Sequence, residues 1–227
     1  MLNKRSHIIE DLDNFDFQGK ELEKTLDGLC KINRWFGNTN QTLRFVQTEI
    51  KENQVKTIVD LGCGGGDNLR AIAQWCEAND KQVKLIGIDG NKYILEYAKS
   101  KGHEGINYIQ ADVLSPDFEI PPCDLLMSSH FMYHFEDEEL VKFLKKAKQK
   151  TKRKVFFSEL ERNIFAFLLF TFIGVAFGRI VKSDGLKAIK RAFRKKELET
   201  ILRRSGFQHF SVQRKIWFRL LVKADVI

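Results

Sequence analysis

The chain has 227 residues, of which 43% are hydrophobic and 30% are charged, and its formal net charge is +8. That length can bury a full hydrophobic core, and the composition is that of an ordinary globular protein. The positive charge alone does not separate a nucleic-acid partner, a membrane surface and a merely solvated basic face. We expect a single domain over residues 1–227.

The cysteines and the first residues exclude two further classes. No C-x-x-C pair is present, so neither a zinc site nor a disulfide framework is indicated. The first seven residues lack the apolar stretch of a secretory signal. We therefore expect a cytoplasmic protein without a metal. The scattered cysteines are Cys30, Cys63, Cys76 and Cys123.

The N-terminal region, residues 1–53, predicts a helical extension. Residues 1–17 are polar and acidic, which predicts a loose arm. Apolar residues then recur every three or four positions over residues 18–36, as in an amphipathic helix, and Gly37 ends the pattern. A second helix is predicted over residues 41–52.

A glycine-rich segment, Thr57–Asp67, organises the middle of the chain and reads T-I-V-D-L-G-C-G-G-G-D. An apolar strand ends in a carboxylate, a turn of four glycines follows, and a helix begins at Asn68. Glycines in such a turn adopt positive φ and let the backbone approach a ligand, and the helix N-terminus offers free N–H groups. The segment predicts a nucleotide or nucleoside site.

The charge of this turn indicates which ligand it suits. The dinucleotide pattern G-x-G-x-x-G is broken by Asp67, and the phosphate-binding G-x-x-x-x-G-K-[ST] pattern is absent. Asp60 and Asp67 flank the turn, which disfavours a pyrophosphate and favours a cation. The segment resembles motif I, V-D-L-G-C-G-x-G, of the class I S-adenosylmethionine-dependent methyltransferases, whose ligand carries a sulfonium and an ammonium. The alternative is a plain glycine turn in an α/β protein.

Two later strands also end in acids. The strand over residues 84–89 ends at Asp89, which can accept hydrogen bonds from both ribose hydroxyls or instead cap the next helix. The third strand, residues 106–112, ends at Asp112. The resemblance implies that Asp112 binds the adenine amine and that the next residue offers its backbone N–H. The predicted cofactor-binding residues are Asp60, Gly62, Cys63, Gly64, Asp67, Asp89, Gly90, Asp112, Val113, Ser128 and Ser129.

The order of the elements predicts the sheet. Two more strands, residues 123–128 and 154–159, bring their carboxyl ends to the same edge. The strands predicted over residues 207–214 and 216–224 are too close for a crossover helix, so they pair antiparallel. We expect an α/β, Rossmann-like, seven-stranded and mostly parallel sheet with one antiparallel strand. Its regions are an N-terminal helical cap (1–53), a cofactor-binding core (54–159), an insertion (160–195) and a C-terminal part (196–227).

The segment after the fourth strand, Ser129–Phe135, indicates the type of acceptor. It lacks the proline motif of DNA amino-methyltransferases. The cytosine-carbon type needs a Pro-Cys nucleophile, but Cys123, which follows Pro122, opens a strand that should be buried. DNA is therefore not expected as a substrate. Tyr133-His134-Phe135 resembles the H-H-F triplet of ubiquinone-type small-molecule methyltransferases. That resemblance implies His134 as base or substrate orienter and His130 as a second candidate, although either histidine can be structural.

An uncharged, phenylalanine-rich segment, residues 164–178, follows the fifth strand. As a helix it would span about 22 Å, against a bilayer core of about 30 Å, so it is too short to cross comfortably. Three interpretations remain open: a core or dimer helix, the wall of a lipophilic pocket, and a membrane-surface anchor. The basic run over residues 182–204 has Phe193 as its only interleaved aromatic residue, which argues against RNA.

The sequence therefore predicts an S-adenosylmethionine-dependent methyltransferase that acts on a small hydrophobic acceptor, aromatic, quinone-like or polyketide-like. Two alternatives remain open: an RNA or protein methyltransferase, and a non-catalytic nucleoside-binding protein that retains the fold. We expect a cytoplasmic location with peripheral contact to a membrane surface as a further option.

Overall fold

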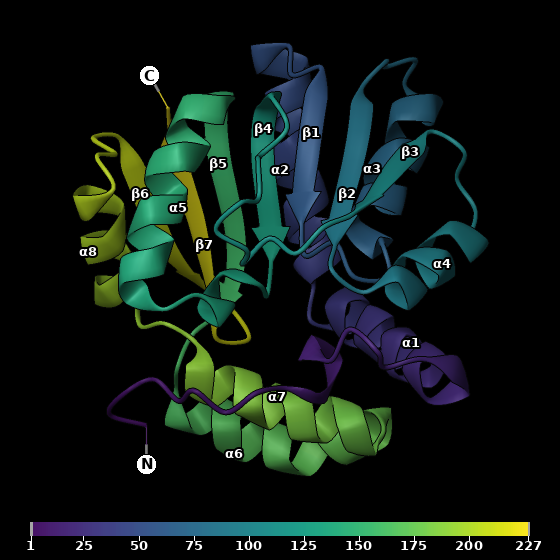
Figure 1. Ribbon diagram of the computed structural model, residues 1–227, viewed down its shortest axis with the longest axis vertical. Coiled ribbons are helices and arrows are strands. Elements are labelled where there is room, and N and C mark those ends of the chain that lie inside the picture. The colour runs from purple at the N-terminus through teal and green to yellow at the C-terminus, as the bar shows by residue number, and fades with distance from the viewer. Residues whose placement is uncertain (1, 227) are drawn as a thin grey trace.

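A seven-stranded sheet forms the centre of the computed structural model, which describes residues 2–226, and its strand order is β3-β2-β1-β4-β5-β7-β6. Helices cover both of its faces (Figure 1). β7 runs antiparallel to β5 and to β6, and all other neighbouring strands are parallel, which confirms the predicted sheet. The strands are β1 (Thr57–Leu61), β2 (Lys84–Asp89), β3 (Ile106–Gln110), β4 (Cys123–Ser129), β5 (Thr151–Leu160), β6 (Phe210–Lys215) and β7 (Arg219–Asp225).

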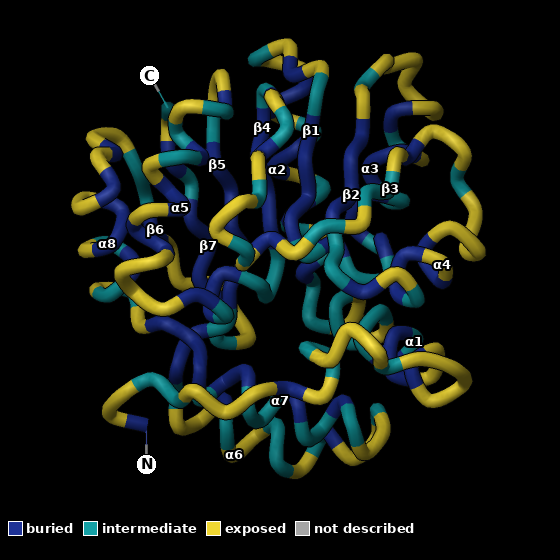
Figure 2. Tube along the Cα trace, viewed as in Figure 1, coloured by how far each residue is buried: buried dark blue, intermediate teal, exposed yellow. Residues whose placement is uncertain are grey.

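The core lies on both faces of the central strands (Figure 2). Val59 of β1 and Leu126 of β4 belong to one buried cluster, and Ile58 and Leu125 belong to the other. All four side chains are completely buried. Strands covered on both faces require continuous apolar runs, and this is why β1 and β4 read as such runs in the sequence.

The predicted helices form, with small shifts at their ends. Gly37 separates the first two, because its φ of 72° suits the left-handed conformation that the turn requires. The α-helices are α1 (Gly19–Trp35), α2 (Asn38–Asn53), α3 (Asp67–Ala78), α4 (Lys92–Ser100), α5 (Asp137–Lys150), α6 (Ile164–Ile173), α7 (Arg179–Arg191) and α8 (Lys195–Arg204), and the 3-10 helices are η1 (Asp11–Asp13), η2 (Met132–His134) and η3 (Gly174–Phe177).

The third strand is shorter than predicted. β3 ends at Gln110, and Asp112 lies in the turn that follows. There its Oδ1 accepts a hydrogen bond from the backbone N–H of Leu114 at 2.9 Å. Short acidic side chains favour such local turns over continued strand pairing.

The prediction of a loose N-terminal arm is wrong. The Arg5 guanidinium donates to the carbonyl oxygens of Tyr133 and Phe135, at 2.7 and 2.8 Å. The backbone N–H of Ser6 donates to the carbonyl of Lys190 at 3.0 Å. The arm therefore runs along α7 (Figure 1), and it is held by contacts that no local sequence pattern predicts.

The phenylalanine-rich segment is not one helix. It forms α6 and then η3, and Gly178, at a φ of 109°, turns the chain into α7, which packs against α6. Only Ala166 of α6 is fully buried, so α6 is not a core helix. Within residues 2–226, no helix has both the length and the hydrophobicity needed to cross a membrane. We call the arm (residues 2–17), α6, η3 and α7 together the cap.

Candidate functional site

The glycine turn after β1 is tied to the end of β2. Gly62, Gly64 and Gly66 all have positive φ, between 52° and 75°. The backbone N–H of Gly64 donates to Oδ2 of Asp89 at 3.0 Å, and that of Asn91 donates to Oδ1 of the same carboxylate at 3.1 Å. The side chain of Asp89 therefore holds the turn open, while Gly64 faces free space in which a Cβ atom would touch nothing within 4 Å.

Three acids gather around this turn. Burial raises the pKa of Asp60 well above its usual value, and the charges of Asp67 and Asp89 raise it further. Burial also raises the pKa of Asp67, although Asn33 and Thr39 donate hydrogen bonds to its carboxylate. Burial raises the pKa of Asp89 to about 6. Such mutual repulsion is relieved by a cation, so this donor set fits a ligand with a sulfonium and an ammonium group.

A cavity of about 540 Å³ lies against the turn and extends under the cap. Among the predicted site residues, it is lined by Asp60, Gly62, Cys63, Gly64, Asp67, Asp89, Gly90, Asp112, Val113, Ser129, His130 and His134. Ser128 is the exception, because it is buried within β4, where it pairs with Phe157 of β5. The predicted residues thus converge from four strand ends on one space.

Most of the cavity wall opposite the turn is apolar. It comes from α1, from the inner faces of α6 and α7, and from the hairpin that joins β6 to β7. Gly185 of α7 allows the ring of Phe170 to lie directly against that helix, because a Cβ atom would overlap the ring. The apolar lining includes Leu29, Ile32, Phe36, Leu169, Phe170, Ile173, Val181, Ile189 and Trp217.

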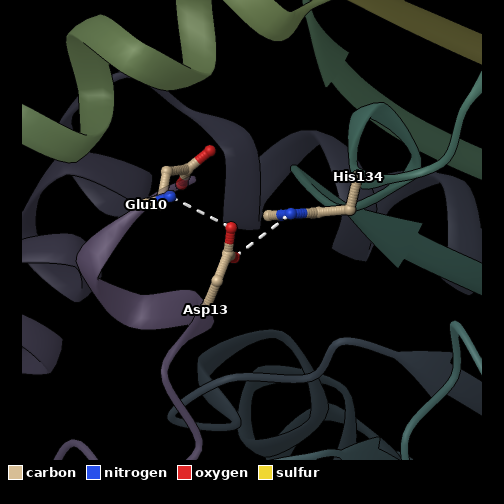
Figure 3. A group of neighbouring side chains, drawn as sticks. All are labelled: Glu10, Asp13 and His134. Atoms are coloured by element: carbon tan, nitrogen blue, oxygen red, sulfur yellow. Dashed lines mark hydrogen bonds and ion pairs between the residues drawn. The ribbon is translucent and has the colours of Figure 1, made fainter. Parts of the chain in front are cut away.

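His134 faces this cavity and is paired with a residue of the arm (Figure 3). Its Nδ1 lies 3.2 Å from Oδ1 of Asp13. Burial lowers the pKa of His134, and the hydrogen bond to Asp13 opposes this only in part. The ring is therefore neutral near pH 7, with the Nδ1 proton directed at the carboxylate and the Nε2 lone pair free to act as a base.

Asp13 is in turn held by a buried network. Although burial opposes it, hydrogen bonds from His134 and Arg191 keep the pKa of the Asp13 carboxyl well below its usual range. Arg191 of α7 donates to Oδ2 of Asp13 at 2.7 Å and to Glu10 at 3.4 Å. Sequence reasoning missed this network. The sequence shows that the arm is acidic, but the partners of these acids lie more than 100 positions away, so no local pattern connects them.

A metal fits poorly at these side chains. Glu10, Asp13 and His134 offer ligand atoms within 4.8 Å of one another. However, Arg191 already pairs with both carboxylates, and the neutral His134 ring already hydrogen-bonds Asp13. The cluster is balanced by these pairs, and a divalent cation would have to displace the guanidinium.

His130 lies nearer the middle of the sheet, at the end of β4. Its backbone has a φ of 54°, and its Nε2 lies 2.6 Å from Nη1 of Arg219 on β7. Burial, and then the charge of Arg219, lower the pKa of His130 well below its usual value. The structure thus places the two predicted histidines in different surroundings, one beside a carboxylate and one beside a guanidinium.

A family model described as a methyltransferase domain matches residues 58–154. The match runs from β1 into β5, so it covers the glycine turn, the strand-end acids and both histidines. No curated protein matches this sequence.

Solved structures with a similar fold are numerous. One from Nostoc punctiforme PCC 73102, described as a candidate O-methyltransferase, has a TM-score of 0.62 at 16% identity, and the match covers 86% of this chain but 58% of that one. Magnesium protoporphyrin IX methyltransferase from Synechocystis PCC 6803, with bound S-adenosylhomocysteine, has a TM-score of 0.57 at 15% identity and 83% coverage of both chains. The plantazolicin methyltransferase BpumL, with a substrate analogue and S-adenosylhomocysteine, has a TM-score of 0.64 at 13% identity, covering 91% of this chain and 97% of that one.

These likenesses establish the fold, and the family match identifies the domain that carries the glycine turn. The predicted methyltransferase class is borne out for residues 58–154 by the family match. The acceptor is a separate matter, because the cap lies outside the matched residues.

Proposed function

We propose that this chain, whose residues 58–154 match a methyltransferase-domain model, transfers the methyl group of S-adenosylmethionine to a small, lipophilic acceptor. The observation that carries this proposal is the cavity of about 540 Å³, which runs from the glycine turn to an apolar wall built by the cap. Pockets of that volume, largely apolar with a few polar groups, are typical of small-molecule sites.

The cofactor half of the cavity is assigned to the strand ends. Asp89 would accept hydrogen bonds from the ribose hydroxyls, and Asp112 with Val113 would hold the adenine. Asp60 and Asp67 would face the cationic end of the ligand, which lowers the cost of burying them as carboxylates. When bound, S-adenosylmethionine supplies an activated methyl group, so the protein needs mainly to position the acceptor and to exclude water.

His134 is proposed as the base for an acceptor hydroxyl. It would take the hydroxyl proton on Nε2 as the acceptor oxygen receives the methyl group that bound S-adenosylmethionine would supply. Asp13 stabilises the imidazolium that forms and keeps the ring in the tautomer with Nε2 free. A phenol, with a pKa of about 10, benefits from such a base. Asp13 is thus a positioning residue that the arm contributes to the site.

The cap supports a lipophilic rather than a polymeric acceptor. Its inner face is largely apolar, and Leu12 and Phe15 of the arm also line the cavity, so the acceptor half is roofed rather than open as an RNA groove would be. Two of the structural relatives carry names that fit this choice, since one methylates magnesium protoporphyrin IX and another plantazolicin. A flat or elongated hydrophobic acceptor is therefore the class we assign.

The outer face of α6 is proposed to rest on a membrane surface. Phe165, Leu168 and Phe172 are exposed there, with Phe172 at 77%. Basic residues rim this face: Arg179 is almost fully exposed, and Lys190 lies 5.1 Å from the ring of Phe167. Exposed aromatics beside cations, in a protein of net charge +8, complement an anionic lipid surface. A lipophilic acceptor would then reach the cavity from the bilayer.

The test is formation of S-adenosylhomocysteine from S-adenosylmethionine with a panel of alkylphenols and alkylhydroquinones, and with bulk RNA and a mixed protein extract as comparison acceptors. We expect turnover with the lipophilic hydroxyl compounds and none with RNA or protein. Turnover confined to RNA or protein would overturn the acceptor class. Absence of S-adenosylhomocysteine binding would overturn the methyltransferase function itself.

A further inference from the structure

Arg219 is a buried cation without a matching anion. It opens β7, its side chain is 2% exposed, and its Nη1 donates to Nε2 of His130 at 2.6 Å. Within residues 2–226 no carboxylate forms an ion pair with it. Burial lowers its pKa to about 10, so it stays charged at neutral pH. Buried charges in proteins are normally paired, because removing an unpaired ion from water is costly.

The nearest acid does not cancel this charge. Glu159 is completely buried, and one of its carboxylate oxygens accepts hydrogen bonds from the backbone N–H groups of Phe131 and Met132, at 3.2 and 3.1 Å. Burial raises the pKa of Glu159 to about 7, so part of the population is neutral at that pH. The charge of Arg219 is therefore only partly balanced from within the chain.

His130 adds a second unused donor at the same place. Because an arginine can only donate, Nε2 of His130 accepts, and the proton of the neutral ring sits on Nδ1. That Nδ1 is buried and has no hydrogen-bond partner among residues 2–226, and the same holds for Nε of Arg219. Two buried N–H donors therefore remain unsatisfied, and each would gain a hydrogen bond from an incoming oxygen.

Both residues line the cavity on its acceptor side. β7 is the third strand from β1 in the sheet order, and three spacings of about 4.8 Å separate their backbones by about 14 Å. Leu160 is the partner of Arg219 on β5, Lys215 is its partner on β6, and Trp217 and Phe218 precede it in the chain.

The hairpin before Arg219 is held in a strained shape. Trp217 and Phe218 have φ values of 64° and 56°, which bulky residues rarely adopt. Trp217 packs edge-on against Phe36 of α1, with ring centroids 5.0 Å apart. Such strain persists where the surroundings over-determine it, most often at ligand sites. Here the turn leads directly into Arg219, and Trp217, Phe218 and Arg219 all line the cavity.

We propose that Arg219 and the Nδ1–H of His130 form an oxyanion subsite that binds a carboxylate of the methyl acceptor. The preferred acceptor is then an amphipathic acid, with its carboxylate on Arg219 and its apolar body against the cap. A bidentate guanidinium contact in a low-dielectric wall is among the strongest single contacts available to such a ligand. The inference rests on the proposed function for the roles of the two cavity halves.

The test compares an acid with a matched neutral compound. Decanoate and decan-1-ol are titrated calorimetrically into the full-length protein saturated with S-adenosylhomocysteine. The wild type is expected to bind decanoate at least tenfold more tightly than decanol. Arg219→Met should lose this preference and leave decanol binding unchanged, whereas Arg219→Lys should keep part of it. Arg203→Met, which removes an arginine on the surface of α8, serves as the matched control.

A second titration separates the two sources of a carboxylate. S-adenosylhomocysteine carries its own carboxylate, whereas 5′-methylthioadenosine lacks the amino-acid part. If Arg219→Met weakens binding of S-adenosylhomocysteine tenfold but spares 5′-methylthioadenosine, the subsite belongs to the cofactor and the inference is overturned. Equal binding of decanoate by the wild type and both Arg219 variants also overturns it. Wild-type protein that fails to bind S-adenosylhomocysteine contradicts the proposed function instead. Circular dichroism of each variant establishes that it is folded.

Discussion

The two halves of the cavity are built in different ways. The half that we assign to the cofactor consists of one glycine turn and the acids Asp60, Asp67 and Asp89, and its key contact joins Gly64 and Asp89, which are 25 positions apart. The acceptor half joins Asp13 to His134 and Arg191, and His130 to Arg219, across at least 89 positions. The contacts of the first half depend on backbone conformations that a short stretch of sequence indicates. The contacts of the second half form only when segments that are far apart in the sequence pack together.

This difference predicts how the halves respond to change. Damage to the glycine turn and its acids should remove cofactor binding, while damage to the acceptor half should leave cofactor binding intact and remove turnover. Each experiment below either breaks that division or sharpens it.

The largest effect is expected at Asp89. Asp89→Ala removes the acceptor for the Gly64 N–H and for the ribose hydroxyls, so the affinity for S-adenosylhomocysteine should fall at least ~100-fold, equivalent to about 2.7 kcal/mol. Isothermal titration calorimetry measures this. Asp117→Ala, which removes an exposed acid in the loop after β3, is the control and should bind as the wild type does. Unchanged affinity in Asp89→Ala would remove that residue from the site.

The second effect separates the halves. His134→Asn should lower the rate of S-adenosylhomocysteine formation with an alkylphenol ~100-fold, and Asp13→Asn ~10-fold, as expected for a base and its orienting carboxylate. Both should bind S-adenosylhomocysteine normally. Because the two residues act as one unit, the double variant should be no slower than His134→Asn alone. Asp16→Asn, an exposed acid on the same arm, is the control. Additive losses in the double variant would show that Asp13 acts independently.

The third effect is a pH dependence confined to the cofactor half. The pKa of Asp89 is raised to about 6 by burial, and cofactor binding uses its carboxylate form. Below pH 6 binding must therefore release a proton, and the affinity for S-adenosylhomocysteine should fall up to ~10-fold per pH unit. Above pH 6 it should level off. Asp60 and Asp67, whose pKa values are also raised, act in the same direction. In Asp89→Asn the remaining slope should be smaller, and an unchanged slope would assign it to the other two acids.

The fourth effect concerns the outside of the cap. Flotation with anionic phosphatidylglycerol vesicles at low salt should recover most of the wild-type protein, and Phe172→Asp should reduce the recovered fraction severalfold by placing a charge on the apolar face. Neutral phosphatidylcholine vesicles should recover less, since the basic rim then has no partner. Ile216→Asp is the control, because this residue is exposed on the β6–β7 turn, outside α6. Equal recovery of all three proteins would exclude α6 as the contact.

The smallest effect links the halves. Asn91 caps α4 by accepting from the N–H groups of Tyr93 and Ile94, and it donates to the carbonyl oxygens of Asn14 and Phe17 in the arm. Asn91→Ala should lower the free energy of unfolding by about 1–2 kcal/mol, the range for a lost helix cap. Urea denaturation followed by circular dichroism measures this. A change within error would mean that the arm and α4 are held by other contacts.

The sheet, and the meeting of most predicted site residues at one cavity, could be predicted because each depends on a local pattern. Glycines at positive φ, acids at strand ends and a short final connection all leave a signature within a few residues. β3 was misjudged at its end because Asp112 forms a turn that the apolar run does not reveal. This error shifts the end of one strand, but it does not change the topology of the sheet.

The cap could not be predicted because its order comes from pairings between side chains. The carboxylate of Asp184 in α7 accepts hydrogen bonds from the backbone N–H groups of Asp11 and Leu12. These bonds fix the arm, although its polar sequence predicts a loose segment. Arg219 likewise reads as an ordinary charged residue at the start of a strand. Only the fold shows that it is buried beside His130. Long-range polar networks of this kind have no periodic signature in the sequence, so they cannot be predicted from sequence patterns.

The central claim is that S-adenosylmethionine binds where the parallel strands end, and co-crystallisation with S-adenosylhomocysteine tests it most directly. The account predicts density along the glycine turn, with the ribose hydroxyls on Asp89 and the adenine beside Asp112. An empty turn in crystals grown at saturating ligand, or the ligand bound elsewhere on the chain, would contradict it.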